Sequence, residues 1–235
     1  MPRVLIIGTG IAGLFAALRL ANAGLMVTVL TKQRPKDSST NWAQGGIAAS
    51  LDKPNVQEIE GHVADTLRAG AGMCNESVVQ MVVEEAGDRI QDLLEIGVNF
   101  EKTTDGEFQL AQEGGHSSRR ILHAKDATGR EIERALNDAA RRHPNISLKP
   151  NTLAIDLIQR EHKDPRKGIC GVWALDQDSG NVETITGGAV LLATGGAGQL
   201  WDKTTNPSVA TGDGVAMAYR TCLLYTSPSP RDQRG

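Results

Sequence analysis

Hydrophobic residues first gather in two short runs separated by one helical stretch. Residues 3–7 (RVLII) are apolar and β-branched, as in a buried parallel strand, and residues 25–30 (LMVTVL) form a second such run. Between them, apolar residues recur at helical spacing as far as Gly24, a typical helix stop. These residues are Leu14, Ala17, Leu18, Leu20 and Ala21. The pattern predicts a β-α-β unit at the start of the chain.

Helical periodicity returns twice further along the chain. Between Asn55 and Ile96 it is interrupted by the Gly-rich residues 69–74 (AGAGMC), which predicts two or three helices lying on the sheet. The periodic positions there are Val79, Val82, Val83, Ala86, Ile90, Leu93 and Leu94. Residues 128–131 (TGRE) have the form of a capping box and predict a helix that ends before Pro144. Its apolar stripe is Ile132, Ala135, Leu136, Ala139 and Ala140.

Strand patterns dominate residues 146–194. The runs are ISLK, LAIDLI, ICGVWALD and the buried run AVLLAT, and the segment DQDSGN supplies turn signals for an antiparallel excursion. The predicted fold class is therefore α/β, with a parallel sheet, flanking helices and an antiparallel β-meander. The last residues, SPSPRDQRG, have the composition of a disordered segment.

The amino-acid composition and charge limit the kinds of molecule that the protein is expected to bind. The 235 residues carry a net charge of −3, and the Lys and Arg residues are scattered, so nucleic acid and anionic membranes are not expected partners. The distant residues Cys74, Cys170 and Cys222 favour reduced thiols over a disulfide framework or a metal site. No apolar run is long enough to span a bilayer, and the chain enters a strand at once, without room for a signal peptide. These features predict a cytoplasmic protein with a small-molecule partner.

The segment GTGIAG has the G-x-G-x-x-G spacing between a strand and a helix. This spacing lets the backbone approach a pyrophosphate and directs the helix N-terminus at its charge. The candidate cofactor-binding residues are Gly8, Thr9, Gly10, Ile11, Ala12 and Gly13. A tight turn without a ligand is the structural alternative. Where an NAD enzyme carries an acidic residue, this chain has Thr31 and Lys32, and Lys32 is either a solvated charge or a contact to the adenosine side or the phosphates.

Residues 38–50 (SSTNWAQGGIAAS) combine serine, threonine, amide and a Gly-Gly pair after the first β-α-β unit. Such a composition suits a backbone loop that lies against a large planar ligand better than it suits a core. The segment raises two questions, namely which ligand it contacts and whether the ligand is bound covalently.

Several motifs in a fixed order answer the first question. AQGGIAA, EGGHSSRRILHAKDATG, VLLATGGAG, TTNP and GDGVAMAYR together closely resemble the L-aspartate oxidase family, within the superfamily of succinate dehydrogenase and fumarate reductase flavoprotein subunits. The resemblance covers residues 3 to about 220. It implies a Rossmann-like FAD-binding domain over residues 1–220, followed by residues 221–235, which depart from the family pattern. It also implies that the capping domain, with the family's substrate-binding histidines and catalytic arginine, is absent from this sequence.

The resemblance implies a role for each matching residue. The FAD pyrophosphate is expected at residues 9–12, Lys32 near the adenosine, Leu153 and Ala154 at the adenine, and Asp213 against the cofactor. A further segment is expected along the isoalloxazine and the pyrophosphate. It consists of Ser39, Thr40, Asn41, Trp42, Ala43, Gln44, Gly45 and Gly46.

One residue answers the question of covalency. The dehydrogenase and reductase relatives carry a histidine within R-S-H-T that bonds to the flavin ring, and the aligned residue here is Ser39. A serine hydroxyl cannot form a histidyl link. The sequence therefore predicts FAD that is bound non-covalently.

Glu113, in EGGHS, matches the family's acidic residue that faces the substrate amino group. A carboxylate suits an ammonium group and would repel the carboxylates of succinate or fumarate, so the residue type favours an amino dicarboxylate. An exposed loop glutamate is the structural alternative. His116 and His123 lie near it in sequence and are interpreted as structural or supporting residues. The remaining histidines, His62, His143 and His162, need no special role.

The implied reaction is the oxidation of L-aspartate to iminoaspartate, with oxygen or fumarate as the final electron acceptor. This reaction is the first step of NAD synthesis by way of quinolinate, and the resemblance suggests quinolinate synthase as a partner. Two alternatives remain. One is a soluble fumarate reductase or succinate dehydrogenase-type flavoprotein, and the other is a non-catalytic flavin-binding fragment.

Overall fold

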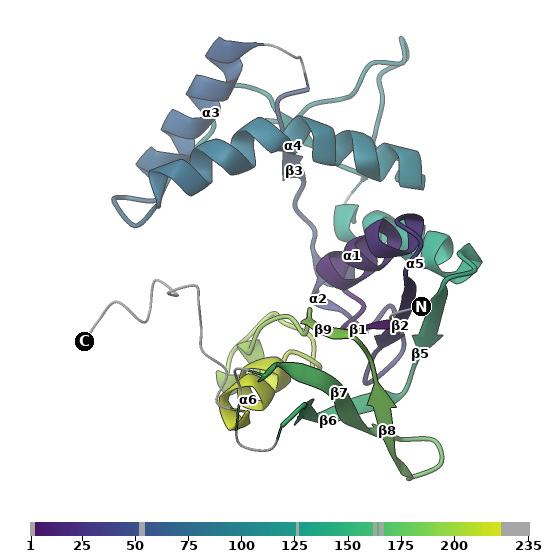
Figure 1. Cartoon of the computed structure of the whole chain (residues 1–235). Helices are drawn as coiled ribbons and strands as arrows, with labels where there is room; N and C mark the ends of the chain where they lie inside the picture. The colour runs from purple at the N-terminus through teal and green to yellow at the C-terminus, as the bar shows by residue number, and fades with distance from the viewer. Residues whose placement is uncertain (1–2, 52–54, 126, 162–163, 165–166, 222–235) are drawn as a thin grey trace. The chain divides into compact units, whose positions relative to one another are not determined.

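The computed structural model describes residues 3–51, 55–125, 127–161, 164 and 167–221 (Figure 1). They form two compact units. The first unit comprises the residues up to Trp42 and those from Ile132 onward, and the second runs from Ala43 to Glu131. The disorder predicted for the last residues falls on 222–235, outside the described residues.

A four-stranded parallel sheet organises the first unit. Its strands are β1 (Arg3–Ile7), β2 (Met26–Leu30), β5 (Ile146–Lys149) and β9 (Ala189–Leu192), in the order β5-β2-β1-β9. Helix α1 (Ile11–Asn22) connects β1 to β2, so the predicted β-α-β unit is confirmed. The central strand β1 pairs with β2 on one side and with β9 on the other.

Side chains that alternate along these strands supply two hydrophobic clusters. Ile6 packs with Val27, Val29 and two alanines of α1, Ala17 and Ala21. The neighbours of Ile6 in β1 belong to the other cluster. That cluster contains Leu5, Ile7, Leu30, Ala154, Leu157, Val172, Ala174, Ile185 and Met217. The parallel sheet is therefore buried on both faces, as its continuous apolar runs predict.

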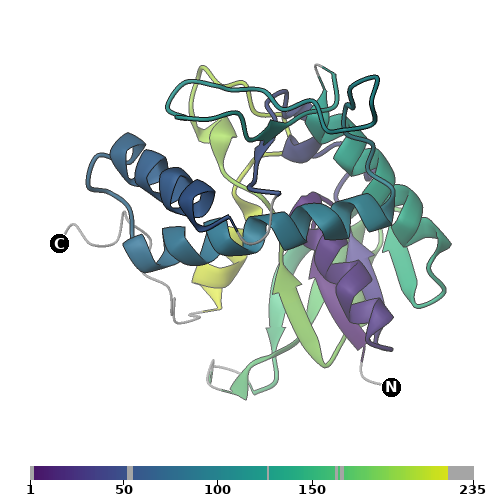
Figure 2. The same cartoon turned by 90° about the horizontal axis from the view of Figure 1, so that it is seen from above.

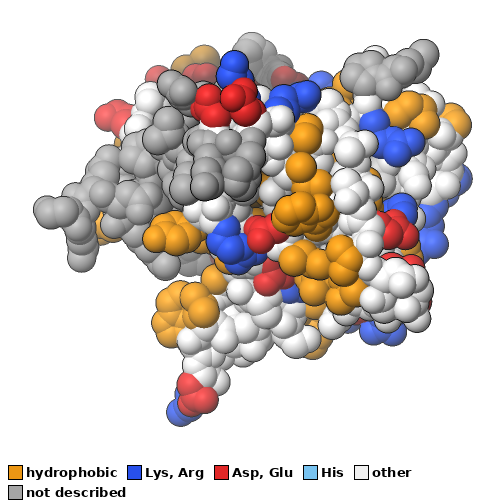
Figure 3. Space-filling model, turned by 60° about the horizontal axis from the view of Figure 1, so that its bottom comes forward, with side chains coloured by type: hydrophobic (Ala, Val, Ile, Leu, Met, Phe, Trp, Pro, Cys, Tyr) orange, Lys and Arg blue, Asp and Glu red, His pale blue; other side chains and the backbone are white. Residues whose placement is uncertain are grey.

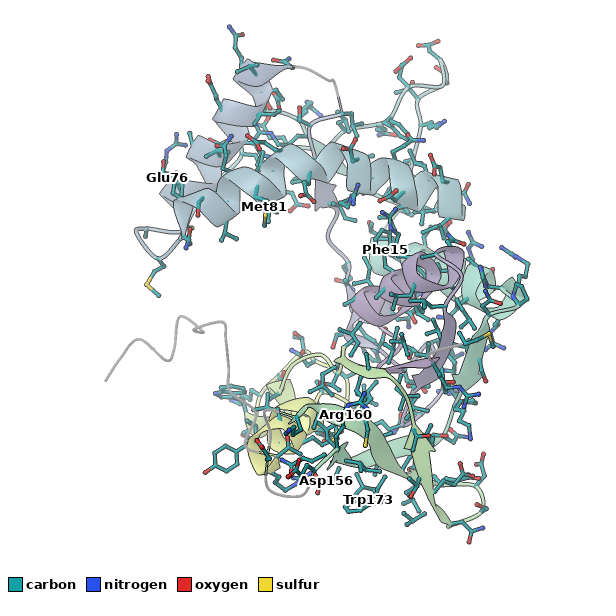
Figure 4. All side chains as sticks on the ribbon, in the orientation of Figure 1. Phe15, Glu76, Met81, Asp156, Arg160 and Trp173 are labelled. Carbon is teal, nitrogen blue, oxygen red and sulfur yellow. The ribbon has the colours of Figure 1, made fainter. Side chains whose placement is uncertain are left out.

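The second cluster draws on an antiparallel meander and a short helix. The meander consists of β6 (Thr152–Gln159), β7 (Ile169–Asp176) and β8 (Val182–Thr186), and the helix is α6 (Asp213–Arg220). Asp156 and Trp173 face each other across β6 and β7 (Figure 4). Trp173 and Val182 are exposed, and hydrophobic side chains also gather on the face seen in Figure 3. The predicted α/β class with a β-meander is confirmed.

Helix α5 (Thr128–Arg142) begins in the second unit and continues in the first. Its predicted stripe is buried, apart from the half-buried Ala139. The predicted capping box is wrong. The Glu131 N–H donates to the carbonyl of Ala127 rather than to the Thr128 side chain, and the Thr128 hydroxyl accepts from the Ala124 N–H at 3.1 Å. The Glu131 carboxylate instead accepts from the backbone and side chain of Asn99, so a tertiary contact replaces the local one.

The second unit contains a pair of helices and a short two-stranded sheet. Helices α3 (Val56–Ala69) and α4 (Glu76–Ile96) lie side by side (Figures 1 and 2), and β3 (Ile47–Ala48) pairs with β4 (Ile121–Leu122). Asn55 and Asn75 cap the two helices by accepting backbone N–H groups. The sequence predicted such helices on the parallel sheet. The structure assigns both helices to the second unit, where they pack against each other, and their position on the parallel sheet stays a prediction.

Candidate functional site

A cavity of about 330 Å³ lies in the first unit at the carboxyl ends of β1, β2 and β9. Ligands of open α/β sheets bind at this edge, and the volume falls in the range of small-molecule sites. The lining includes Ile7, Leu30 and Leu192, which end these three strands, and the first residues of α1. The walls are mostly backbone and apolar side chains, with few charged groups.

The GTGIAG turn forms one wall of this cavity. Gly8 has φ +117° and a Cβ there would overlap the Ala193 carbonyl, so only glycine allows β1 and β9 to close behind the turn. Gly10 precedes α1 and has no side chain to cap it, so backbone and the positive end of a helix face the cavity. A Cβ at Gly10 would approach Thr40 Oγ1 to 3.3 Å. This cradle fits the diphosphate of a dinucleotide.

Residues 39–42 form a short helix, α2 (Ser39–Trp42), rather than the backbone loop that was predicted. The Ser38 hydroxyl accepts from the Asn41 N–H at 3.3 Å, which caps this turn, because a serine oxygen can satisfy a free N–H at a helix start. Thr40 Oγ1 accepts from the Ile11 N–H at 3.0 Å and ties α2 to the start of α1. Trp42 is 62% exposed and therefore does not belong to a core.

Lys32 and Asp213 bring opposite charges to the cavity from distant parts of the chain. Lys32 Nζ lies 2.6 Å from Asp213 Oδ2 and also donates to the Thr211 hydroxyl. Partial burial acts to raise the pKa of Asp213, but hydrogen bonds from Lys32 and Thr211 outweigh it and the pKa is lowered. Asp213 is therefore a carboxylate at neutral pH, and the pair adds little net charge to the wall.

Glu133, on α5, is a buried acid that the sequence did not single out. Its side chain contacts Ser38 Oγ at 3.0 Å and Asn137 Nδ2 at 2.7 Å. Burial raises the pKa of Glu133 to about 7, although both hydrogen bonds oppose the rise. The only signal in the sequence is the i, i+4 spacing of Glu133 and Asn137, which places them on one face of the helix.

Most of the predicted cofactor residues line this one cavity. They are Gly8, Thr9, Gly10, Ile11, Ala12, Lys32, Ser39, Thr40, Leu153, Ala154 and Asp213. Gly13 is buried against the Gly8 carbonyl, and Asn41 and Trp42 do not line the cavity. The residues Ala43, Gln44, Gly45 and Gly46 belong to the second unit, where Gly46 packs on β4. Lining residues that the prediction missed include Asp37, Ser38 and the Thr194–Gly196 turn, which lies within the quoted VLLATGGAG motif.

Glu113 belongs to the second unit and is exposed. Its carbonyl accepts from the His116 N–H at 3.2 Å in a tight turn. His123 Nδ1 lies 2.9 Å from Glu101 Oε2, which agrees with a structural role.

Arg120, a few residues after Glu113, ties the same segment to α3. Its side chain is 2% exposed and donates to Glu58 at 2.9 Å, to Asp65 at 2.8 Å and to Ser118 at 2.8 Å. Asp65 also accepts from the N–H and the hydroxyl of Ser117, both at 2.7 Å. The pKa of Asp65 is strongly lowered, first by the hydrogen bond from Arg120 and then by those from Ser117.

His62, for which the sequence indicates no special role, lies in an unusual setting. It is buried at 7% exposure on α3, its ring lies 5.7 Å from that of His116, and its Nδ1 has no hydrogen-bond partner among the described residues. Burial first, and then the Arg120 charge, lower the pKa of His62, so its ring is neutral at pH 7.

The described residues contain no candidate membrane span and no candidate metal site. None of the helices in these ranges has the length and hydrophobicity to cross a membrane. Within the same part of the chain, no group of three or more His, Cys, Asp or Glu side chains is arranged to hold a metal ion.

Comparison with known proteins identifies relatives over nearly the whole chain. L-aspartate oxidase 2-a, chloroplastic, from Nicotiana tabacum is 47% identical, and the match covers 94% of this chain and 34% of the relative. L-aspartate oxidase from Vibrio cholerae is 44% identical, over 92% of this chain and 41% of the relative. The chain thus spans between a third and about two-fifths of these relatives' length.

Solved structures show the same fold. The Escherichia coli quinol fumarate reductase FrdA, in a variant form, superposes with a TM-score of 0.83 at 28% identity, over 93% of this chain and 37% of that chain. The Mycobacterium smegmatis Sdh1 complex superposes with a TM-score of 0.81 at 32% identity, over 94% of this chain and 39% of that chain.

The predicted resemblance to L-aspartate oxidases is confirmed by these relatives. The family described as "FAD binding domain" matches residues 3–228, which include every residue of the cavity. The chain therefore belongs to the FAD-binding domain family.

Proposed function

We propose that the full-length protein oxidises L-aspartate to iminoaspartate with non-covalently bound FAD. The observation that carries the proposal is the 44–47% identity to relatives named L-aspartate oxidases. Bound FAD supplies a two-electron acceptor for the hydride on the substrate Cα. Because the relatives are much longer than this chain, the complete active site draws on residues outside this sequence.

The residues of this chain would hold the cofactor. The bare backbone at residues 9–12 and the α1 N-terminus bind the diphosphate, and Leu153 and Ala154 offer an apolar surface to the adenine. Lys32 binds on the adenosine side while Asp213 keeps it in place. Ser39 faces the cavity where a covalent flavoprotein would carry histidine, so no bond to the ring forms.

Glu113 would select the substrate by pairing with its ammonium group. Because Glu113 is exposed, its carboxylate is accessible to a ligand. The runner-up function is that of a fumarate reductase or succinate dehydrogenase-type flavoprotein, which the structural similarity to those enzymes favours. Such a substrate has no ammonium group, and a glutamate there would repel its carboxylates.

The test compares two substrates in the FAD-loaded, full-length protein. The neutral amide of glutamine cannot form an ion pair with an ammonium group, so Glu113→Gln should lower kcat/KM for L-aspartate and spare fumarate reduction. Glu107→Gln, another exposed loop glutamate, is the matched control and should change neither rate. If Glu113→Gln lowered both activities by the same factor, Glu113 would not be the residue that selects aspartate.

Three further expectations stay proposals. Quinolinate synthase would use the unstable iminoaspartate product, which co-purification of the two proteins would test. A cytoplasmic location is proposed for this protein, although some relatives are named as chloroplastic. Residue 220 is the proposed limit of the family pattern within the chain.

A further inference from the structure

Glu133 is an acid without a basic partner in the described part of the chain. It is 1% exposed on α5, and its two carboxyl oxygens contact only neutral groups, Ser38 Oγ and Asn137 Nδ2. An ionised carboxylate is costly in such a place, and burial accordingly raises the pKa of Glu133 to about 7. Both protonation states are therefore populated near neutral pH.

Ser38 connects this acid to the cofactor cavity. Ser38 lines the cavity beside Ser39 and Thr40, and its Oγ accepts from the Asn41 N–H at 3.3 Å. Thr40 in turn accepts from the Ile11 N–H, the first of α1. Separate hydrogen bonds thus fix Ser38 to the buried carboxyl group and fix its chain neighbour Thr40 to the helix start where the diphosphate is expected.

The protonation state of Glu133 decides what the Ser38 hydroxyl can do, because a hydroxyl has one proton to donate. When Glu133 is a carboxylate, the Ser38 O–H must donate to it. When Glu133 is a carboxylic acid, its own O–H donates to Ser38 Oγ, while its other oxygen still accepts from Asn137. The Ser38 proton is then free to point into the cavity.

We propose that Glu133 is a positioning residue for FAD, which in its acid form turns the Ser38 O–H toward the cavity to donate to an oxygen of the cofactor. The deprotonated form withdraws that donor. The proposal concerns the FAD site alone and does not depend on which substrate the protein oxidises.

The other carboxylates near this site keep their protonation state through neutral pH. Asp37, next to Ser38, pairs with Arg34 at 2.9 Å, and the pKa of Asp37 is lowered chiefly by that hydrogen bond. The pKa of Asp213 is also lowered, in its contact with Lys32. His143 lies beyond the end of α5, roughly 15 Å from Glu133 at 1.5 Å per residue. If the affinity for FAD changes near pH 7 through the side of the cavity that contains Ser38, the titrating group is therefore Glu133.

The experiment measures the FAD Kd of the full-length apoprotein by fluorescence titration from about pH 6 to about pH 8. In the wild type, Kd should rise about fivefold from about pH 6 to about pH 8 and level off about tenfold above its low-pH value, since the deprotonated form lacks one hydrogen-bond donor. Glu133→Gln presents an amide N–H to Ser38 in place of the acid O–H, so its Kd should stay low and flat over this range. Ser38→Ala should bind FAD about tenfold more weakly than wild type at low pH, also without a pH dependence.

Asp138→Asn is the matched control, because Asp138 is a half-exposed carboxylate on the same helix. It should keep the wild-type affinity and pH profile. Thermal unfolding of each apoprotein identifies any variant that fails to fold, and Ser38→Ala, a small change at a cavity wall, then still tests the proposal. A pH profile of Glu133→Gln equal to that of wild type, or a folded Ser38→Ala with wild-type affinity, would overturn it.

Discussion

Replacing Arg120 by methionine should destabilise the protein strongly. Methionine keeps an unbranched apolar stem but removes the charge and every hydrogen bond to Glu58, Asp65 and Ser118. Asp65 would keep its bonds from Ser117 and its ion pair with the exposed Arg68, but would lose its buried cation at a site where its own side chain is 3% exposed. Breaking a buried pair in this way costs roughly 3–5 kcal/mol, a large share of a typical stability of roughly 5–15 kcal/mol.

Urea unfolding of the full-length protein, followed by circular dichroism, measures the loss of stability in Arg120→Met. With a slope of about 2 kcal/mol/M, the midpoint should fall by about 1.5–2.5 M. Arg119→Met is the control, because Arg119 is exposed and makes one long contact, at 3.5 Å, to the Leu110 carbonyl. A surface change of this kind should cost less than about 0.5 kcal/mol. The urea midpoint of Arg120→Lys should lie between those of the other two variants, since lysine keeps the charge but lacks the planar guanidinium group with its several N–H donors.

The pH dependence gives an independent check. Because the pKa of Asp65 is lowered in the folded state, its contribution to stability is present above the unfolded pKa of about 3.9 and is lost as the pH falls below it. The difference between wild type and Arg120→Met should therefore narrow below about pH 4. If Arg120→Met and Arg119→Met unfolded at the same urea concentration, the buried ion pair would contribute nothing and the reasoning would fail.

Acid or heat precipitation should release the flavin into the supernatant, as Ser39 predicts, and yellow colour that stays in the pellet would contradict non-covalent binding. Gly10→Val should abolish FAD binding while the fold survives, because the branched side chain would fill the cradle beside Thr40; a normal flavin content in the purified variant would mean that the turn holds no ligand. The free energy of unfolding of the apoprotein should decline between about pH 4.3 and pH 7, because the raised pKa of Glu133 makes its contribution complete below the unfolded value and lost as the pH rises through the folded one. Glu133→Gln should flatten that part of the profile, and an unchanged slope would show that Glu133 does not titrate there.

Much of the first unit was predictable because its signals are local. The runs RVLII and ICGVWALD match β1 and β7 at both ends, since a buried strand needs an unbroken apolar run and polar residues end it. The clustering of GTGIAG, Lys32 and Asp213 around one cavity was expected only from family resemblance, because no spacing rule connects residues so far apart in sequence.

The parts that escaped prediction depend on tertiary contacts. Helix α2 has only four residues and relies on Ser38, which itself contacts Glu133 from α5. Glu133 sits among alternating charged residues, and charged side chains are almost never fully buried, so sequence patterns assign it to the surface. The burial of Arg120 could not be predicted for the same reason. Arg119 and Arg120 are identical neighbours in the sequence, yet Arg119 is exposed and Arg120 is buried.

The order of strands in the parallel sheet has a consequence for synthesis on the ribosome. β1 is made first, but its neighbour β9 and the Asp213 partner of Lys32 come late, with 181 residues between Lys32 and Asp213. At roughly 5–20 residues per second, this separation corresponds to roughly 10–40 s of translation. During that interval one edge of β1 lacks its partner, and open strand edges favour aggregation. The cavity proposed for FAD is therefore complete only after β9 and Asp213 have been synthesised.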